Sequence, residues 1–272
     1  MECCIDCLKG LAQKTVRLSG GDGGLLSDCY ELVEELYENE ETPPGISNRL
    51  LKHIKNTTGV YDPYVFLKER ELRRAKRAID LLQDSFFDSI EGVVKLSALG
   101  NSLDFFTGDG DGFDARGFKF SGDMDKIEEA IYIKGNDVLI LGDNVGDFLF
   151  DMPLVEFLRS KKKQVHYAVK EHPVQNDLSM PDVIGFGFTK IFDNFISTGT
   201  DEVGIRREEM RGKIKHLLEI DAVVIAKGMG NFETLSEYYS ERPVIHIMKV
   251  KCAAVSGTVG HDVGTHVALV KK

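Results

Sequence analysis

The stretch that decides the fold class of this chain is Val138-Leu139-Ile140-Leu141-Gly142-Asp143-Asn144-Val145-Gly146-Asp147. Its first four residues form a short run without any polar side chain, and a polar segment with two glycines ends that run. Such a run is typical of a strand that is buried on both faces of a sheet. We therefore predict that this stretch is a central strand followed by a functional loop.

Further apolar runs follow towards the C-terminus, separated by stretches with helical periodicity. They span residues 165–169, 192–196, 222–225 and 244–247, and 267–270 is expected to be the last strand. Strands that alternate with helices predict an α/β fold with a mostly parallel sheet wrapped by helices. Residues 1–106 instead have helical patterns joined by breakers, so we predict a helical N-terminal subdomain there and the α/β core over residues 107–272.

Several features of the first part of the chain lead to specific expectations. Ser27 is the expected N-cap of an amphipathic helix, and the segment Thr42-Pro43-Pro44-Gly45 is expected to interrupt the helical pattern. A long helix should follow Tyr64, with Lys68 and its other basic side chains facing solvent. The segment 107–114 resembles part of a calcium loop but lacks the glutamate at the twelfth position, so a turn or lid is predicted.

Charge and composition exclude some classes of partner. The chain has 272 residues with 34 Lys and Arg against 44 Asp and Glu, a net charge of −10, which disfavours binding to nucleic acids and to anionic membranes. No apolar run approaches the roughly 20 residues of a membrane helix, and the first residues do not form a secretory leader. We expect a cytoplasmic protein that binds neither nucleic acid nor membrane, and the oligomeric state stays open.

The five cysteines are an odd number and cluster near the N-terminus, unlike a secreted disulfide framework. Reduced thiols are therefore expected. The pair Cys4-Ile5-Asp6-Cys7 has a spacing used in metal and redox sites, and Cys3, Cys29 and Cys252 are the further thiols. Structural burial and an accessory metal site both remain open for them.

Polar side chains follow the predicted strands at the points where the strands end. Asp143-Asn144 follows the first run, Asn176-Asp177 the second, Ser197 the third, and the segment from Lys227 to Glu233 the fourth. In an open α/β sheet the carboxyl ends of the strands form one edge, where ligands bind. The sequence thus predicts one shared pocket.

The residue types indicate the chemistry of this pocket. Asp143, Asn144 and Asp177 offer hard oxygen ligands, which suit Mn²⁺ or Mg²⁺, with Co²⁺ or Ni²⁺ as alternatives. Such a cation polarises a phosphate, and Lys227 is expected to neutralise further charge in the transition state. Taken singly, Asp143-Asn144 is also a common helix cap, and Lys227 is also compatible with a surface turn.

Four motifs follow one another along the chain: Gly142-Asp143-Asn144-x-Gly146 with Phe150-Asp151 downstream, then Asn176-Asp177, then Lys227-Gly228-x-Gly230-Asn231-Phe232-Glu233, and finally Lys251-Cys252. As an ordered set they resemble the motifs of the damage-control phosphatases, a family also called domain of unknown function 89. Earlier segments, among them Cys4-x-x-Cys7 and Gly100-Asn101-x-x-Asp104, are similar to those of microbial members. The resemblance extends from the N-terminus to about residue 260.

This resemblance implies a three-layer α/β/α core and metal-dependent hydrolysis of phosphomonoesters of small metabolites, sugar phosphates among them. By motif position it assigns the metal to Asp143, Asn144 and Asp177. It also assigns phosphate contact to Lys227.

The resemblance further implies that Asn101 and Asp104 reach the pocket and that Asn231 and Glu233 line it. Two departures leave the substrate open. Asp147 stands where a glutamate is expected, and Lys170-Glu171-His172 replaces a basic residue followed by glycine.

Two other functions stay open at this point. An S-adenosylmethionine-dependent methyltransferase is one, although no Gly-x-Gly-x-x-Gly turn follows the first core strand. A non-catalytic protein that binds a metal or metabolite in the same pocket is the other. For the phosphatase, a water bound to the cation is the expected nucleophile, with direct attack by a carboxylate as the alternative.

Overall fold

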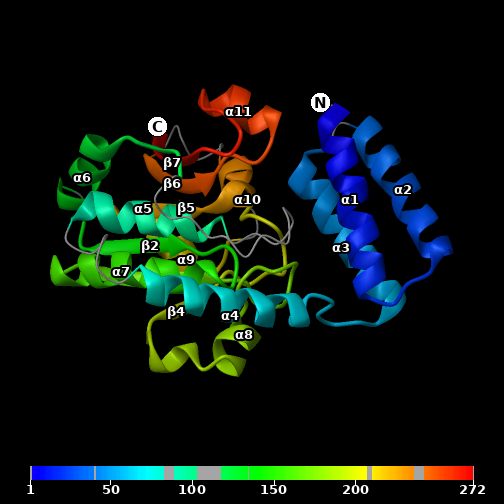
Figure 1. Ribbon diagram of the computed structural model, residues 1–272, viewed down its shortest axis with the longest axis horizontal. Coiled ribbons are helices and arrows are strands. Elements are labelled where there is room, and N and C mark those ends of the chain that lie inside the picture. Colours follow the sequence, from blue (N-terminus) through cyan, green and yellow to red (C-terminus); the bar gives the residue numbers. More distant parts are fainter. Residues whose placement is uncertain are drawn as a thin grey trace.

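The computed structural model describes residues 2–39, 41–82, 89–102, 118–133, 135–206, 210–235 and 242–271. Within these residues the centre of the molecule is a seven-stranded sheet with the order β1-β7-β6-β5-β2-β3-β4 (Figure 1). The strands are β1 (Phe120–Gly122), β2 (Asp137–Leu141), β3 (Gln164–Val169), β4 (Phe195–Ser197), β5 (Val223–Lys227), β6 (Val244–Lys249) and β7 (His266–Lys271). All neighbouring strands are parallel except β6 and β7, which are antiparallel.

The predicted α/β fold class is confirmed, and five of the strands coincide with apolar runs of the sequence. The third run was placed wrongly, because β4 begins only at Phe195 and Phe192 packs into the core before the strand starts. Strand β1 was not predicted, since its three residues at the edge of the sheet contain a single apolar side chain. Edge strands bury less apolar surface than central ones and so leave a weaker pattern.

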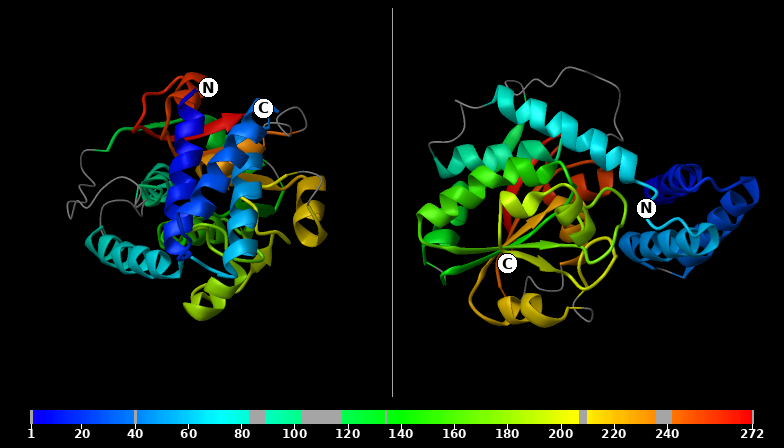
Figure 2. Two further views of the ribbon diagram at one scale, coloured as in Figure 1. Left: turned by 90° about the vertical axis from the view of Figure 1, so that its right-hand side faces the viewer. Right: turned by 90° about the horizontal axis from the view of Figure 1, so that it is seen from below.

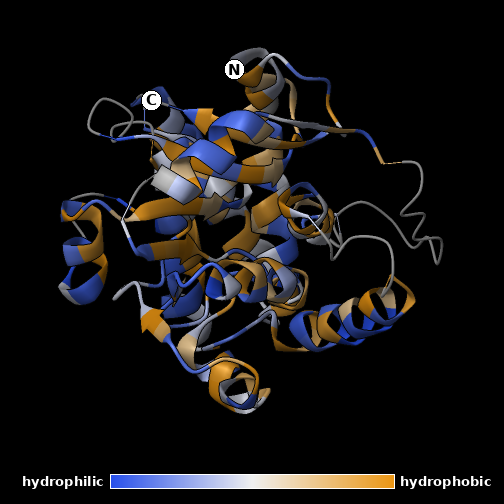
Figure 3. Ribbon diagram, turned by 90° about the vertical axis from the view of Figure 1, so that its left-hand side faces the viewer, coloured by the Kyte–Doolittle hydropathy of each residue, from blue (hydrophilic) through white to orange (hydrophobic). Residues whose placement is uncertain are grey.

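Helices cover both faces of the sheet. They are α4 (Val65–Leu81), α5 (Ile90–Gly100), α6 (Met124–Ile133), α7 (Asp147–Ser160), α8 (Met180–Gly185), α9 (Gly212–Glu219), α10 (Gly228–Thr234) and α11 (Ala253–Val259). Because successive side chains of a strand point to opposite faces, Ile245 and Ile247 pack with the core under α5 and α7, whereas Met248 packs with α10 and α11. Hydrophobic and hydrophilic residues alternate along these helices, which have one buried face (Figure 3).

The first three helices form a bundle of their own at one end of the core (Figure 2). They are α1 (Glu2–Leu18), α2 (Gly23–Glu38) and α3 (Pro43–Thr58), and they share a separate apolar cluster that includes Val33 and Leu50. In contrast, α4 and α5 contribute Leu72, Val93 and Val94 to the cluster beneath the sheet. The predicted boundary near residue 106 and the segment 107–114 lie outside the described residues, so both stay predictions.

The bundle is fastened to the core through α3. Asn48 Oδ1 accepts a hydrogen bond of 2.7 Å from the backbone N–H of Val203. Lys55 Nζ lies 2.9 Å from Asp201 Oδ2 and donates to the carbonyl oxygen of Pro173 at 3.0 Å. The α3 helix therefore contacts the two segments that follow β3 and β4.

The helix starts differ from the sequence-based expectations. Asp22, not Ser27, caps α2, because its Oδ1 accepts a hydrogen bond of 3.0 Å from the N–H of Leu25. Thr42 caps α3, and the two prolines that follow occupy its first turn, where a missing N–H costs nothing. The prolines thus begin a helix as well as interrupt the pattern.

Lys68 was expected to face solvent but is buried. Its ammonium group lies 3.0 Å from Asp62 Oδ2 and 2.8 Å from Asp182 Oδ2. A buried charge requires such partners, so Lys68 joins the segment before α4 to helix α8.

The sequence predicts that the chain has no membrane-spanning helix and that its cysteines are reduced. None of the described helices combines the length and the apolar character that a membrane span requires. Among the described residues, Cys4, Cys7, Cys29 and Cys252 are not joined by disulfide bonds.

A steric test concerns the crossing of α5 and α7. A Cβ atom at Gly100 would lie 2.8 Å from Cβ of Phe150, so Gly100→Ala should lower the free energy of unfolding by about 1–3 kcal/mol, as overpacking does. Gly10→Ala is the matched control in α1, where a Cβ meets nothing, and it should raise stability by about 0.5–1 kcal/mol. Urea unfolding of the three proteins measures both effects. Equal stability of Gly100→Ala and wild type would contradict the close crossing.

Candidate functional site

The loops that follow β2 and β3 are joined to each other at the carboxyl edge of the sheet. Asn144 and Asp177 form an isolated antiparallel bridge. The backbone N–H of Val145 donates to the carbonyl of Asn176 at 3.0 Å, and that of Leu178 donates to the carbonyl of Asp143 at 2.8 Å. The structure therefore brings Asp143, Asn144 and Asp177 together, although they come from two separate loops.

A glutamate from α4 holds the same two loops from below. Glu71 is 1% exposed; its Oε1 accepts from the N–H of Gly146 at 2.8 Å, and its Oε2 accepts from Asn176 Nδ2 at 3.0 Å. Sequence reasoning missed this residue, because nothing near Glu71 in the sequence distinguishes it from the other charged residues of its helix.

Asp143, Asn144 and Asp177 line a cavity of about 120 Å³. The remaining lining residues come from the loops after β3, β4 and β6 and from α10, and they are Gln175, Asn176, Val203, Gly204, Met229, Gly230, Asn231 and Lys251. The first residue of α10, directly after β5, lies against the carboxylate of Asp143. Gly228 has a φ of +75°, and a Cβ there would lie 2.1 Å from Asp143 Oδ2, so only glycine fits.

The carboxylate of Asp143 is held by two amide groups. Asn101 Nδ2 donates to Asp143 Oδ2 at 2.7 Å and to Asp147 Oδ2 at 2.7 Å, while Asn144 Nδ2 donates to Asp143 Oδ2 at 3.0 Å. The Oδ1 atom of Asn101 accepts from the N–H of Lys249 at 3.1 Å. Asn101 was predicted to bind substrate, but its amide group is already engaged within the chain and positions the two carboxylates.

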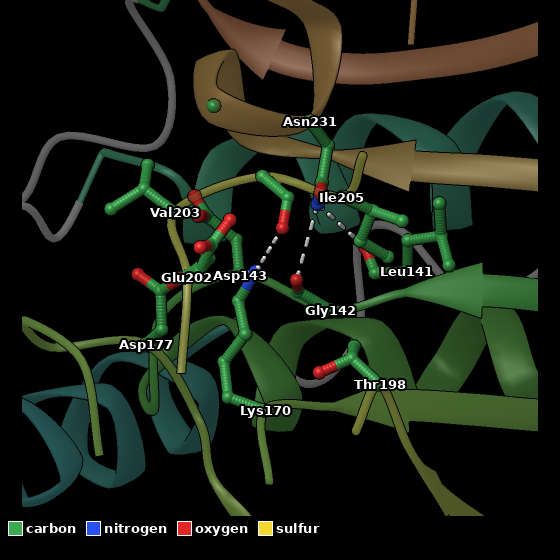
Figure 4. Close-up of polar contacts among 12 residues, drawn as sticks. Leu141, Gly142, Asp143, Lys170, Asp177, Thr198, Glu202, Val203, Ile205 and Asn231 are labelled. Carbon is green, nitrogen blue, oxygen red and sulfur yellow. Dashed lines mark hydrogen bonds and ion pairs between the residues drawn. The ribbon is translucent and has the colours of Figure 1, made fainter. Parts of the chain in front are cut away.

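Lys170, at the end of β3, supplies positive charge beside Asp177. Its ammonium is buried, donates to the carbonyl of Gly204 at 2.7 Å and lies 3.7 Å from Asp177 Oδ2 (Figure 4). Burial and the nearby charge of Asp143 together raise the pKa of Asp177 to about 6, against the opposing effect of Lys170. Burial also lowers the pKa of Lys170. The sequence places Lys170 directly after a predicted strand, but the predicted site does not include it.

The carboxylates of Asp147 and Asp151 continue the row of acidic groups along α7. Ser97 Oγ donates to Asp151 Oδ1 at 2.5 Å, and the hydroxyl of Tyr167 donates to Asp151 Oδ2 at 2.7 Å. Asn101, one turn after Ser97, pairs with Asp147, one turn before Asp151. Burial raises the pKa of Asp147 to about 8, which Lys227 opposes and Asp143 reinforces.

Lys227 was predicted to lie in the pocket beside the phosphate, but its ammonium lies in the core beside Asp151. Its ammonium is completely buried and donates to the carbonyl and the hydroxyl of Ser97, both at 2.8 Å, and to Asp151 Oδ1. An ammonium has three hydrogens, and these bonds use all of them. Lys227 therefore forms a buried ion pair and does not line the cavity, and its contact with phosphate stays a prediction. Lys251 lines the cavity, and Lys170 lies beside Asp177.

Of the other predicted site residues, Asn231 lines the cavity, whereas Ser197 and Glu233 do not. Asn231 Nδ2 donates to the carbonyl of Gly142 at 3.3 Å (Figure 4) and to that of Lys227 at 2.8 Å. Its buried Oδ1 has no hydrogen-bond partner among the described residues. Ser197 is at the end of the edge strand β4, where its hydroxyl donates to Glu171, and Glu233 is exposed. Neither lines the cavity, and Asp104 lies outside the described residues.

The donors present fit a hard divalent cation. In the described part of the chain, no three His, Cys, Asp or Glu side chains are grouped so that they could hold a metal. A cation in this cavity would therefore depend on two carboxylates, Asp143 and Asp177, completed by amide oxygens such as that of Asn144. The unpaired oxygen of Asn231 is a further neutral donor at the cavity wall. Such an all-oxygen set suits Mg²⁺ or Mn²⁺ better than zinc, and the metal ligands stay a prediction.

A first prediction concerns pH. Asp147 has a pKa of about 8 in the folded chain, so it keeps a proton there that the unfolded chain releases above about pH 4. The free energy of unfolding of the metal-free protein, measured in the presence of a chelator, should therefore fall between about pH 5 and about pH 8. Asp147→Asn should flatten this decline, while Asp80→Asn, at an exposed position of α4, should keep it. Urea unfolding across this range measures the slopes. The same slope in Asp147→Asn and wild type would contradict the assignment.

A second prediction concerns Lys227. Lys227→Met leaves Asp151 buried without its counter-charge and should lower the free energy of unfolding by about 3–5 kcal/mol. Adding Asp151→Asn to the same chain should recover part of that loss, because the remaining group is neutral. Thermal and urea unfolding of both variants measure the effect. Wild-type stability of Lys227→Met, together with weaker phosphate binding, would instead support the phosphate contact predicted from the sequence.

Known proteins resemble this chain in sequence and in fold. A damage-control phosphatase of Pyrococcus horikoshii is 29% identical over 264 residues, which cover 93% of this chain and 91% of the relative. A damage-control phosphatase of Archaeoglobus fulgidus is 25% identical over 284 residues, which cover 98% and 97%. The crystal structure of a DUF89 family protein from P. horikoshii matches with a TM-score of 0.86 at 26% identity, over 100% of this chain and 99% of that chain. The family model of the damage-control phosphatase ARMT1-like domain matches residues 1–267, and the chain therefore belongs to this family.

Proposed function

We propose that this chain is a metal-dependent phosphatase that hydrolyses phosphomonoesters of small metabolites, sugar phosphates among them. Its family supports the phosphatase activity as such. The observation that carries the proposal is that Asp143, Asn144 and Asp177 converge from two loops on one cavity at the carboxyl edge of the sheet.

Electrostatics favours a divalent cation between these residues and a phosphate. Asp143 and Asp177 would repel a phosphate dianion, and Lys170 offsets only part of their charge. A bound divalent cation neutralises the carboxylates and polarises the phosphoryl group. Mn²⁺ or Mg²⁺ is the proposed cofactor, with Co²⁺ or Ni²⁺ as alternatives.

The residues of the chain have separate roles in this proposal. Asn101 fixes the carboxylate of Asp143 through its bond of 2.7 Å, so that the acidic group does not need to reorient during the reaction. Lys251 lines the cavity from the loop after β6 and takes the phosphate-binding role that had been expected of Lys227. Asn231 closes the wall on the side of α10.

The proposal predicts phosphate release by the purified protein from p-nitrophenyl phosphate and from a panel of sugar phosphates in the presence of Mn²⁺, Mg²⁺, Co²⁺ or Ni²⁺. Asp143→Ala should lower kcat/KM by about 100-fold or more, because each factor of ten corresponds to about 1.4 kcal/mol of transition-state stabilisation. Asp80→Asn is the control that should keep wild-type activity. Calorimetry with Mn²⁺ should show that Asp143→Ala weakens metal binding.

The result that would overturn the proposal is equally specific. It is the absence of phosphate release with all four metals, combined with unchanged Mn²⁺ binding by Asp143→Ala.

A further inference from the structure

A second cavity lies at the edge of the sheet opposite to the first cavity, which is the one beside Asp143. It has a volume of about 480 Å³ and lies at the beginning of β3, between the end of α7, the segment before β4 and the start of α9. Its size is within the range of roughly 300–1,000 Å³ that is usual for small-molecule sites. Neither the sequence motifs nor the proposed chemistry assigns a role to it.

The two cavities are separate. Strand β3 has six residues, so its two ends are about 17 Å apart. The first cavity is at the carboxyl end of this strand and the second at its amino end, and they share no lining residue. A ligand in the second cavity therefore does not touch the acidic groups of the first.

The lining of the second cavity is positively charged, although the chain as a whole has a net charge of −10. Arg159, Lys163 and Lys213 line it together with the carboxylate of Asp193, so three positive charges and one negative charge leave a formal charge of +2. The exposed lysines of the turn 161–162 add charge of the same sign. A local positive field of this kind attracts anions.

Two of the three cations are held by groups around the cavity. Arg159 Nη2 lies 2.6 Å from Asp193 Oδ1, and the guanidinium lies over the ring of Phe192, 4.5 Å from its centre. Lys163 Nζ donates to the carbonyl oxygen of Gly135 at 2.9 Å. A guanidinium has five N–H donors in one plane and can bind two oxygens of an oxyanion at once, so Arg159 has donors for a ligand beyond its bond to Asp193.

A buried network holds the third cation. The ammonium of Lys213 donates to Asn194 Oδ1 at 3.3 Å, and Asn194 Nδ2 donates inwards to His166 Nδ1 at 2.8 Å and to the carbonyl of Val165 at 2.7 Å. His166 is 4% exposed, and its Nε2 donates to Asp137 Oδ1 at 2.7 Å. Asp137 lies behind His166 and does not line the cavity.

This network fixes which way the amide of Asn194 faces. Both of its donor hydrogens are used inside the protein, on Val165 and His166, so its oxygen faces Lys213. The ammonium of Lys213 uses one of its three hydrogens in this bond. The remaining hydrogens can be donated to a ligand.

The lining offers many hydrogen-bond donors and little carbon surface. Gln164 adds an amide to the cationic groups, and Val165 is the one aliphatic residue among the described residues of the lining. A ligand with an aromatic or aliphatic body would bury little apolar area here. The cavity suits a compact ion with several negatively charged oxygens.

We infer that the second cavity is a binding site for a small polyvalent oxyanion, whose charge is carried by phosphate or carboxylate groups, and that Arg159, Lys163 and Lys213 hold it. The inference is independent of the proposed function, because the site lies at the opposite edge of the sheet and requires no metal.

Calorimetry with pyrophosphate and, separately, with citrate tests this inference. The protein is freed of metal and transferred to a chelator-free buffer of low ionic strength, in which attraction between charges is least screened. Wild type should bind one equivalent of at least one of the two anions with a Kd of about 1 mM or lower. Binding of pyrophosphate alone would assign the site to phosphate groups, and binding of citrate alone to carboxylates. Absence of saturable binding of both anions would overturn the inference.

Two variants test whether the anion occupies this cavity. Lys213→Glu and Gln164→Glu each place a carboxylate in the lining, and each should raise the Kd by about tenfold or more. Both proteins are expected to fold, because a negative charge in the first turn of α9 favours the helix and Gln164 is exposed at the start of β3. Thermal unfolding without added anion checks this.

Lys215→Glu is the matched control. It lies on α9 and changes the net charge of the chain by the same amount as Lys213→Glu, but its side chain is 63% exposed and does not line the cavity. It should keep the Kd within about twofold of wild type. Equal weakening by Lys213→Glu and Lys215→Glu would show attraction by the general field of the surface and would overturn the site.

A last variant separates the two cavities. Lys251 lines the first cavity, and Lys251→Ala should leave anion binding by the metal-free protein unchanged. Binding that is lost in Lys251→Ala but kept in Lys213→Glu would place the anion in the first cavity and would equally overturn the inference.

Discussion

The structure depends on neutralising carboxylates that are buried where α5 crosses α7. Asp147 and Asp151 lie one turn apart on α7, and the side chains that bond to them, Asn101 and Ser97, lie one turn apart at the end of α5 in the opposite order. The two helices therefore pack antiparallel, and Lys227 provides the one full counter-charge among the bonds to Asp151. Because unpaired charge in a core is so costly, this pairing fixes the helices with respect to the sheet.

The site inherits its geometry from this crossing. Asn101 links Asp147 inside the core to Asp143 at the edge of the cavity, so a residue of the helix layer orients a residue of the β2 loop. Glu71 of α4 likewise fixes the loops after β2 and β3, because it accepts hydrogen bonds from both of them. Acidic groups that ordinarily repel one another are thus kept close by amide donors and by Lys170.

Much of this arrangement was predictable from the sequence, and the failures have physical causes. The central strands were found because strands buried on both faces are wholly apolar, and the grouping of Asp143 with Asp177 followed from the parallel order of the strands. Strand ends do not reveal to which face the last side chain points. Lys227 is the last residue of β5 and Lys170 directly follows β3, but Lys227 bonds to α5 in the core, whereas Lys170 bonds to Gly204 at the cavity. Ser197 ends an edge strand, too far along the sheet to reach the cavity lining.

Helix α3 is attached to the segments after β3 and β4. The groups that carry the charge of the site and the groups that hold its surrounding loops therefore belong to different layers of the structure. The acidic groups belong to loops of the sheet, whereas Asn48 and Lys55 bring a helix from a different layer up to those loops. Substitutions on the exposed turns of that helix can accumulate without disturbing the groups at the strand ends. On the proposed function, this separation lets the molecules that enter the site be varied through the helix bundle while the acidic groups at the sheet edge stay unchanged.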